Sequence, residues 1–202
     1  MGKIYVIMGK SATGKDTIYQ EVYHRLEEQL ATIVTYTTRP IRDREMEGRE
    51  YHFVTEAEYE KLHNSQKVIE ERAYHTVYGI WRYFMVNDGQ IDLNEKNYIM
   101  VGTLEAYQQI RAYYGEEHVV PLYIEVENGT RLTRALEREK MQSNPKYVEM
   151  CRRFIADEED FCEEKVEEAG ILKRYQNRAL EQCVEEITED ILADLAKSEM
   201  KK

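Results

Sequence analysis

Seven residues near the N-terminus combine glycines with a lysine in a pattern that binds phosphate groups. Residues 9–15 read GKSATGK and match GxxxxGK, directly after the apolar run 4–8 and directly before a segment with helical periodicity. Glycines let the backbone curl so that successive N–H groups face one concavity, and the start of a helix adds the positive end of its dipole. Lys15 adds a mobile cation for β- and γ-phosphates, so we expect a site for ATP. The residues expected to bind its phosphates are Gly9, Ser11, Ala12, Thr13, Gly14, Lys15, Asp16 and Thr17.

The residue after the lysine departs from the usual pattern. A Ser or Thr whose hydroxyl binds Mg²⁺ normally follows the lysine, whereas this chain has Asp16, with Thr17 next. A carboxylate beside a triphosphate is repelled unless a cation lies between them, so we expect Asp16 to be a magnesium ligand, helped by Thr17. Alternatively, Asp16 only favours the first helical turn electrostatically, an effect of about 0.3–1 kcal/mol.

A second polar cluster follows between residues 35 and 53. Arg39, Arg42 and several hydroxyl groups surround a turn, and Tyr51 lies a little further along the chain. Arginine gives forked donors to phosphate oxygens, and a tyrosine hydroxyl adds a neutral donor. The cluster predicts a site for a phosphate monoester, so we expect the chain to phosphorylate a small acceptor that already carries a phosphate.

The elements that would position both clusters alternate between strand and helix. The first of four apolar runs has the length and flat hydrophobicity of a strand buried on both faces, and the three further runs alternate with helical patterns. The runs lie at 4–8, 32–35, 98–102 and 119–126. Every fourth residue from Ile18 to Leu30 is apolar, which predicts an amphipathic helix after the phosphate loop. The pattern indicates an α/β fold with a parallel central sheet flanked by helices.

The chain is long enough for one domain with subdivisions. Its 202 residues, 42% of them hydrophobic, can form one core. Residues 36–92 change to short extended pieces around a helical stretch near 56–63, which predicts a small inserted subdomain. Residues 131–168 are highly charged and mostly helical, with a break near 143–145. The core would comprise about 1–35, 93–130 and 170–202, and it would end in an amphipathic helix.

Composition excludes several classes of function. The net charge of −11 argues against a nucleic-acid-binding surface. Three cysteines without CxxC spacing predict neither a disulfide framework nor a zinc site, and they suit a reducing cytoplasm. No apolar stretch is long enough to span a membrane, and the N-terminus does not read as a signal peptide. We expect a cytoplasmic monomer or homodimer that acts on a small molecule and binds neither nucleic acid nor membranes.

The second cluster resembles a known family signature. Residues 37–53, TTRPIRDREMEGREYHF, are similar to the guanylate kinase pattern TTRxxRxxExxGxxYxF, and the phosphate loop resembles that of the same family. The resemblance implies a P-loop NTPase fold, an acceptor-binding insert at about 36–92 and a helical lid at about 131–168. It implies ATP and Mg²⁺ as cofactors, and transfer of the γ-phosphoryl group of ATP to GMP, giving ADP and GDP.

The resemblance also assigns roles to single residues. The residues that it implies for GMP binding are Thr35, Arg39, Arg42, Tyr51, Glu70 and Tyr78. Glu70 would read guanine, because a carboxylate can accept hydrogen bonds from N1–H and N2–H together. The residues that it implies for catalysis are Lys15 and three lid arginines, namely Arg134, Arg138 and Arg153.

The chain departs from the family at three further positions. Ile80 stands where a small hydroxyl residue is common, and Met100 and Gly102 replace strand acids near the metal and the base; Asp16 would compensate for these acids. A GKD phosphate loop without those acids is also similar to ribose 1,5-bisphosphate phosphokinase, so a kinase for a phosphorylated sugar is one alternative. Another is a non-catalytic guanylate-kinase-like module that binds phosphopeptides, although Lys15 and the lid arginines count against it.

Overall fold

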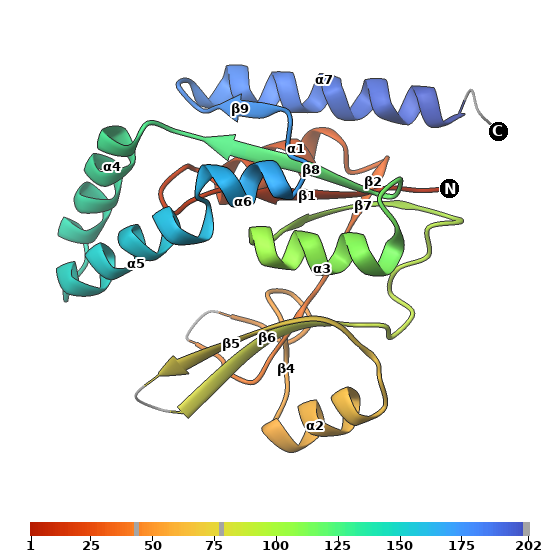
Figure 1. Cartoon of the computed structure of the whole chain (residues 1–202), viewed down its shortest axis with the longest axis horizontal. Helices are drawn as coiled ribbons and strands as arrows, with labels where there is room; N and C mark the ends of the chain where they lie inside the picture. Colours follow the sequence, from red (N-terminus) through yellow and green to blue (C-terminus); the bar gives the residue numbers. More distant parts are fainter. Residues whose placement is uncertain (43–44, 77–78, 200–202) are drawn as a thin grey trace.

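The computed structural model describes residues 1–42, 45–76 and 79–199, and its larger sheet is parallel (Figure 1). Five strands lie in the order β2-β7-β1-β8-β9, and every pairing among them is parallel. The strands are β1 (Ile4–Met8), β2 (Leu30–Thr32), β7 (Asn97–Val101), β8 (Val119–Glu125) and β9 (Arg174–Gln176). The α/β fold with a parallel central sheet is therefore confirmed.

Helices cover both faces of this sheet. The side chains of the buried strand β1 alternate: Ile4 and Val6 belong to the apolar cluster under α3 and α6, whereas Tyr5 and Ile7 belong to the cluster under α1 and α7. In Figure 1, α1 and α7 lie above the sheet, α3 lies below it, and α6 is drawn in front of it. These helices are α1 (Lys15–Arg25), α3 (Leu104–Tyr114), α6 (Glu163–Glu168) and α7 (Leu180–Glu199).

The helix after the phosphate loop is shorter than its four-residue repeat predicts. α1 ends at Arg25, and the N–H groups of Gln29 and Leu30 both donate to the carbonyl of Leu26, which turns the chain into β2. The strand predicted at 32–35 lies instead at Leu30–Thr32, and residues 33–35 follow it outside any strand. Leu26 and Leu30 are nevertheless buried in the same cluster as α1, so the repeat correctly marks the buried side chains but crosses a turn.

A second, mixed sheet lies between residues 36 and 86. Its strand order is β4-β3-β6-β5, with β3 antiparallel to β6 and β6 antiparallel to β5. The strands are β3 (Tyr36–Thr37), β4 (His52–Phe53), β5 (Val68–Thr76) and β6 (Gly79–Val86). Helix α2 (Glu56–Asn64) begins with a capping box at Thr55 and packs Tyr59 against Phe84 of β6. This sheet falls inside the predicted insert, whose acceptor-binding role stays a prediction.

A glutamine joins the second sheet to the core. β5 is an edge strand, so its outer backbone groups need partners. Gln109 of α3 supplies them at Glu71: its Oε1 accepts from the main-chain N–H at 3.1 Å, and its Nε2 donates to the main-chain carbonyl at 3.4 Å. The contact sets β5 beside α3.

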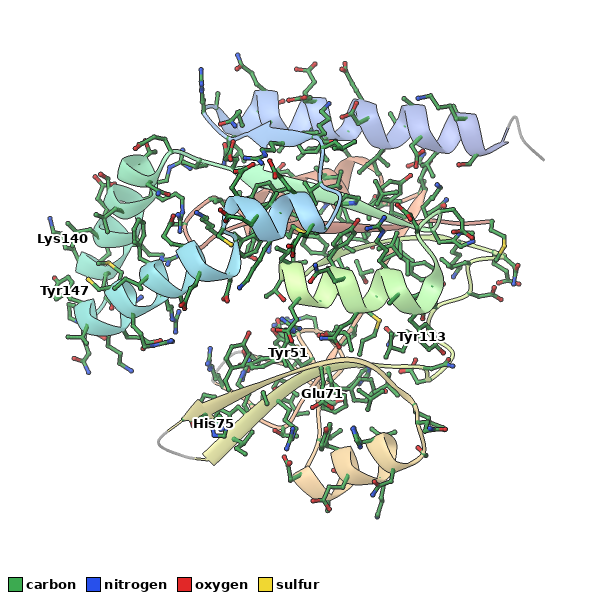
Figure 2. All side chains as sticks on the ribbon, in the orientation of Figure 1. Tyr51, Glu71, His75, Tyr113, Lys140 and Tyr147 are labelled. Atoms are coloured by element: carbon green, nitrogen blue, oxygen red, sulfur yellow. The ribbon has the colours of Figure 1, made fainter. Side chains whose placement is uncertain are left out.

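Two charged helices project from the larger sheet. They are α4 (Asn128–Lys140) and α5 (Tyr147–Asp160), and the break between them includes the predicted interruption at 143–145. Figure 2 shows Lys140 and Tyr147 at their outer ends. Within the ranges that the structure describes, no helix is both long and apolar enough to cross a membrane.

Candidate active site

The phosphate loop follows the central strand β1, and its glycines allow close contacts. A Cβ atom at Gly9 would lie 2.5 Å from the carbonyl oxygen of Ile124 in β8. Gly14 has φ 84°, in the left-handed region, and a Cβ there would lie 2.7 Å from Nδ2 of Asn177. Any larger residue would push the loop away from these neighbours, so both glycines are required for its position.

Asn177 links the phosphate loop to a lid arginine. Its buried Nδ2 donates to the carbonyl of Thr13 at 2.7 Å, and its own carbonyl accepts from Nη2 of Arg134 at 3.2 Å. The structure thus brings Arg134, one of the predicted catalytic residues, to the edge of the loop. The sequence around Asn177 gives little signal for this role, because the contact joins residues 164 positions apart.

A carboxylate from the lid lies on the phosphate loop. Asp157 of α5 accepts a hydrogen bond from the main-chain N–H of Ser11 at 2.8 Å and another from its hydroxyl at 3.3 Å. The main-chain N–H of Ser11, which the sequence predicts to bind phosphate, therefore donates here to a carboxylate oxygen. This shows that the loop can bind an anion at this point.

A fully buried arginine completes the contact between lid and loop. Arg131 of α4 donates from Nε to the carbonyl of Ser11 at 3.1 Å and from Nη2 to Asp157 at 2.9 Å. Its Nη1 donates to Glu158 at 2.7 Å, and Lys10 donates to the same carboxyl group at 2.7 Å. Burial opposes ionisation of Glu158, but Lys10 and Arg131 hold its pKa below the usual range. We call Lys10, Ser11, Arg131, Asp157 and Glu158 the loop–lid network.

Sequence reasoning missed most of the loop–lid network. Arg131 and both acids fall in a segment so rich in charge that it reads as solvated helix. Only the fold shows that Arg131 is completely buried and that its partners come from α5 and the loop.

The predicted metal ligands lie at the start of α1. The Asp16 carboxylate is 79% exposed and lies 3.8 Å from Nζ of Lys15; Thr17 is also exposed. Among the described residues, no group of three or more His, Cys, Asp and Glu side chains could hold a metal ion. Mg²⁺ is commonly held by one or two carboxylates together with substrate phosphates, and the accessible Asp16 beside the loop fits that kind of site.

Two of the predicted catalytic arginines lie further out on the lid. Arg138 of α4 and Arg153 of α5 are exposed, and Arg153 donates to Glu149 at 2.9 Å. In the described part of the chain, neither forms a hydrogen bond to the phosphate loop. Their catalytic role stays a prediction.

The signature residues of the acceptor cluster surround one carboxylate. Arg39 is 3% exposed, and its Nη1 and Nη2 donate to the carboxylate of Glu45 at 2.8 and 2.6 Å. This pairing lowers the pKa of Glu45 to about 2. The main-chain N–H of Arg42 donates to the same carboxylate at 2.8 Å, and the Arg39 guanidinium lies 5.3 Å from the centre of the Tyr51 ring. Arg39, Arg42 and Tyr51 are thus brought together.

The other residues predicted to bind GMP behave differently. Glu70 is 1% exposed, and Arg72 takes both of its carboxylate oxygens, with Nη2 at 3.1 Å and Nε at 3.2 Å. Burial raises the pKa of Glu70, and Arg72 acts in the opposite direction. Thr35 accepts a main-chain hydrogen bond from His52 at 2.9 Å, and Tyr78 lies outside the described residues. Sequence reasoning did not single out Arg72.

A cavity of about 450 Å³ lies beside this ion pair. Its volume is within the range of roughly 300–1,000 Å³ that is typical of small-molecule sites. Arg72 and Tyr74 of β5 form one wall, and Thr103 and Glu105 at the start of α3 form another. Strand β7 carries no carboxylate. Met100, at one of the two positions where the family has an acid, is buried in the core. At the other position, Gly102, a Cβ atom would lie 3.0 Å from Val6.

Comparison with known proteins agrees with this arrangement. The family model described as guanylate kinase matches residues 1–169 of the chain. The chain belongs to the guanylate kinase family. The match covers the phosphate loop, the second sheet and both lid helices.

Individual relatives support the family assignment over different lengths. The guanylate kinase of Thermotoga maritima is 37% identical over 93 residues, 44% of this chain and 44% of the relative. That of Porphyromonas gingivalis is 26% identical over 201 residues, 98% of this chain and 100% of the relative. The matches of higher identity cover less than half of the length of those guanylate kinases.

A solved structure supports the fold. The crystal structure of guanylate kinase from Anaplasma phagocytophilum aligns with a TM-score of 0.63 and 18% identity, over 96% of this chain and 86% of that chain. At this identity the match concerns the fold alone, and it agrees with the parallel sheet and flanking helices of this guanylate kinase family member.

Replacement of Arg131 by methionine is expected to destabilise the protein. Arg131→Met keeps an unbranched apolar stem but leaves Asp157, whose side chain is only 15% exposed, without its main cation. Breaking a buried ion pair in this way costs about 3–5 kcal/mol. Urea unfolding followed by circular dichroism measures the loss. Arg152→Met is the control, because Arg152 is 64% exposed. This variant should lower the free energy of unfolding by less than about 1 kcal/mol. Equal losses in the two variants would contradict a structural role for the network.

Proposed function

We propose that this protein transfers the γ-phosphoryl group of ATP to the phosphate of GMP, forming ADP and GDP. The observation that supports the proposal is that one guanylate kinase family chain carries two candidate phosphate sites: the glycine loop after β1 and the cluster of Arg39, Glu45 and Tyr51. The curated relatives named above are guanylate kinases, which supports the same substrate pair.

On this proposal, the donor is held by the loop. Main-chain N–H groups of the loop would bind the phosphates, with the Ser11 N–H exchanging Asp157 for a phosphate oxygen, and the start of α1 adds the positive end of its dipole. Lys15, 22% exposed, reaches the β- and γ-phosphates as a mobile cation. These groups balance the charge that spreads over the transferred phosphoryl in a loose transition state.

The acceptor needs orientation rather than deprotonation. A phosphate oxygen of GMP is already ionised at neutral pH, so transfer requires no general base. Arg42 and the Tyr51 hydroxyl would bind the acceptor phosphate, while Glu45 keeps Arg39 in place. Held in line with the donor, the acceptor oxygen attacks without first diffusing into position.

Magnesium would be held by Asp16 and Thr17 together with the phosphates, and when bound it neutralises negative charge on the β- and γ-groups. Asp16 lies in the first turn of α1 and is accessible, so it can reach an ion at the loop. No carboxylate on β7 competes for this role, because the acids usual in the family are Met100 and Gly102 here.

Closure of the lid would complete the site. Arg134 is already linked to the loop through Asn177, whereas Arg138 and Arg153 lie further out on α4 and α5. Movement of the outer lid toward the loop would add their charge and exclude water, which otherwise hydrolyses ATP. We place this activity in the cytoplasm, in a monomer or homodimer.

The proposed function is tested by turnover with Mg²⁺ and ATP on a panel of acceptors. A coupled assay compares GMP, dGMP, IMP, AMP, UMP and ribose 1,5-bisphosphate, and GMP should be the preferred acceptor. Lys15→Ala should lower kcat on GMP by about 10²–10³-fold, because it removes a charge aimed at the transferred phosphoryl. Activity on the sugar phosphate alone, or near-normal activity of Lys15→Ala, would disprove the proposal.

The acceptor role of Arg42 predicts a selective effect on KM. Arg42→Ala should raise the KM for GMP by about 10-fold or more and leave the KM for ATP unchanged, because a charged hydrogen bond contributes about 1.5–3 kcal/mol. Initial-rate kinetics with each substrate varied in turn measures both constants. Arg49→Ala is the control, because it removes another exposed arginine of the same loop, one that pairs with Glu50. Equal increases in both KM values would refute the assignment.

The metal role of Asp16 predicts a change in magnesium dependence. Asp16→Asn removes one negative ligand of the ion but keeps the shape of the side chain. The Mg²⁺ concentration for half-maximal rate should rise by roughly 10-fold, as measured by titrating Mg²⁺ at fixed ATP. Glu21→Gln, on the exposed side of α1, is the control. If Asp16 acts only on the helix dipole, the Mg²⁺ titration will not shift.

A further inference from the structure

Arg72 stands between the candidate guanine-reading carboxylate and the cavity. The Glu70 side chain is completely buried, whereas the Arg72 side chain is 15% exposed and lines the cavity of about 450 Å³. Both oxygens of Glu70 are already paired with the fork of Arg72. A ligand in the cavity can therefore contact Arg72, whereas Glu70 does not line it.

The geometry of the ion pair fixes the direction of Arg72. A guanidinium has five donors in one plane, and Glu70 uses only those on Nε and Nη2. The hydroxyl of Tyr74 is a further side-chain hydrogen-bond partner of Arg72. With two donors on Glu70 and one on Tyr74, two of the five donors remain for a ligand. A buried charge held on one side by a buried carboxylate is a stiff, oriented donor.

The surroundings of Arg72 place it beside the acceptor phosphate cluster rather than in it. Tyr51 and Tyr74 are close enough to Arg72 to affect its charge, and Tyr74 packs against Tyr83, whose hydroxyl accepts from Arg39. The phosphate cluster is gathered around Glu45, whereas Arg72 faces the cavity formed with α3. An acceptor anchored at Tyr51 would extend its other end toward Arg72.

We infer that Arg72 is a specificity-determining residue that donates to O6 and N7 of the acceptor's purine base, and that Glu70 is the positioning residue that holds it. The inference rests on the proposed function, because it assumes a purine nucleotide as the acceptor. Guanine presents O6 and N7 as adjacent acceptors to an arginine fork, whereas adenine presents an amino group in place of O6. Arg72 would therefore select 6-oxopurines.

This assignment differs from direct reading by Glu70 in a way that analogues can separate. A carboxylate reader contacts N1–H and the 2-amino group, whereas an arginine reader contacts O6 and N7. The analogue 7-deaza-GMP replaces N7 by C–H and keeps the other groups. IMP keeps O6 and N7 but lacks the 2-amino group.

The experiment measures kcat/KM for GMP, 7-deaza-GMP and IMP at saturating ATP, first with the unmodified protein. We expect 7-deaza-GMP to be about 10-fold poorer than GMP, since a bidentate contact loses one of its two bonds. We expect IMP to stay within about threefold of GMP. Equal use of GMP and 7-deaza-GMP would overturn the inference and leave the proposed function intact. Absence of turnover on all three acceptors would overturn both.

Two variants then connect the discrimination to Arg72. Arg72→Lys keeps the charge but loses the fork, and the double variant Glu70→Gln with Arg72→Met removes both charges so that neither is buried alone. Each variant should have a kcat/KM for GMP that is about 10- to 100-fold lower. Its kcat/KM values for GMP and 7-deaza-GMP should be equal, and its KM for ATP should be unchanged. Variants that keep the original preference for GMP over 7-deaza-GMP would overturn the inference.

Glu70→Gln alone tests the positioning role, and Arg82→Lys is the matched control. Glu70→Gln should lower kcat/KM for GMP and IMP by the same factor, because both acceptors carry O6 and N7. A larger loss on GMP than on IMP would show that Glu70 reads the 2-amino group itself. Arg82, opposite Ala73 on β6, pairs with Glu56 and Glu71 toward α2, so Arg82→Lys should leave the preference between GMP and 7-deaza-GMP unchanged.

Discussion

The fully buried guanidinium of Arg131 fixes how the phosphate loop and the lid helices lie together. A charge without solvent is tolerated only if hydrogen bonds and opposite charges surround it, and here they come from Ser11 on the loop and from Asp157 and Glu158 on α5. The base of the lid is therefore tied to the loop by interactions that are costly to break. The outer ends, near Lys140 and Tyr147, have no such constraint and project away from the sheet (Figure 2).

The acidic excess of the chain helps to position its cations. Three arginines of the candidate site have carboxylate partners: Glu45 for Arg39, Glu70 for Arg72, and Asp157 for Arg131. These pairs turn long, flexible side chains into oriented groups, because a fork held on one side leaves its remaining donors pointing in a set direction. A net charge of −11 is thus compatible with a site for anionic substrates.

Local patterns predicted the centre of the fold, but contacts between distant residues escaped them. The run 4–8, the glycine loop and the next helix were predicted because each is encoded by its own few residues. Leu30 was assigned to the wrong element because apolar spacing does not reveal a turn. Arg131 meets Ser11 across 120 positions, and Asn177 meets Thr13 across 164, so only the folded chain shows that these polar groups share one site.

The loss of two strand acids is coupled to the packing of the central sheet. Met100 fills part of the core beneath α3, and a side chain at Gly102 would press against Val6 of β1. A carboxylate in the place of Met100 would lie among apolar side chains without a partner, at a cost of several kcal/mol. Restoring the acids would therefore require repacking of β1, β7 and α3. The accessible carboxylates of Asp16, at the start of α1, and of Glu105, at the start of α3, lie on helix ends, where solvent and ligands can reach them without disturbing the core.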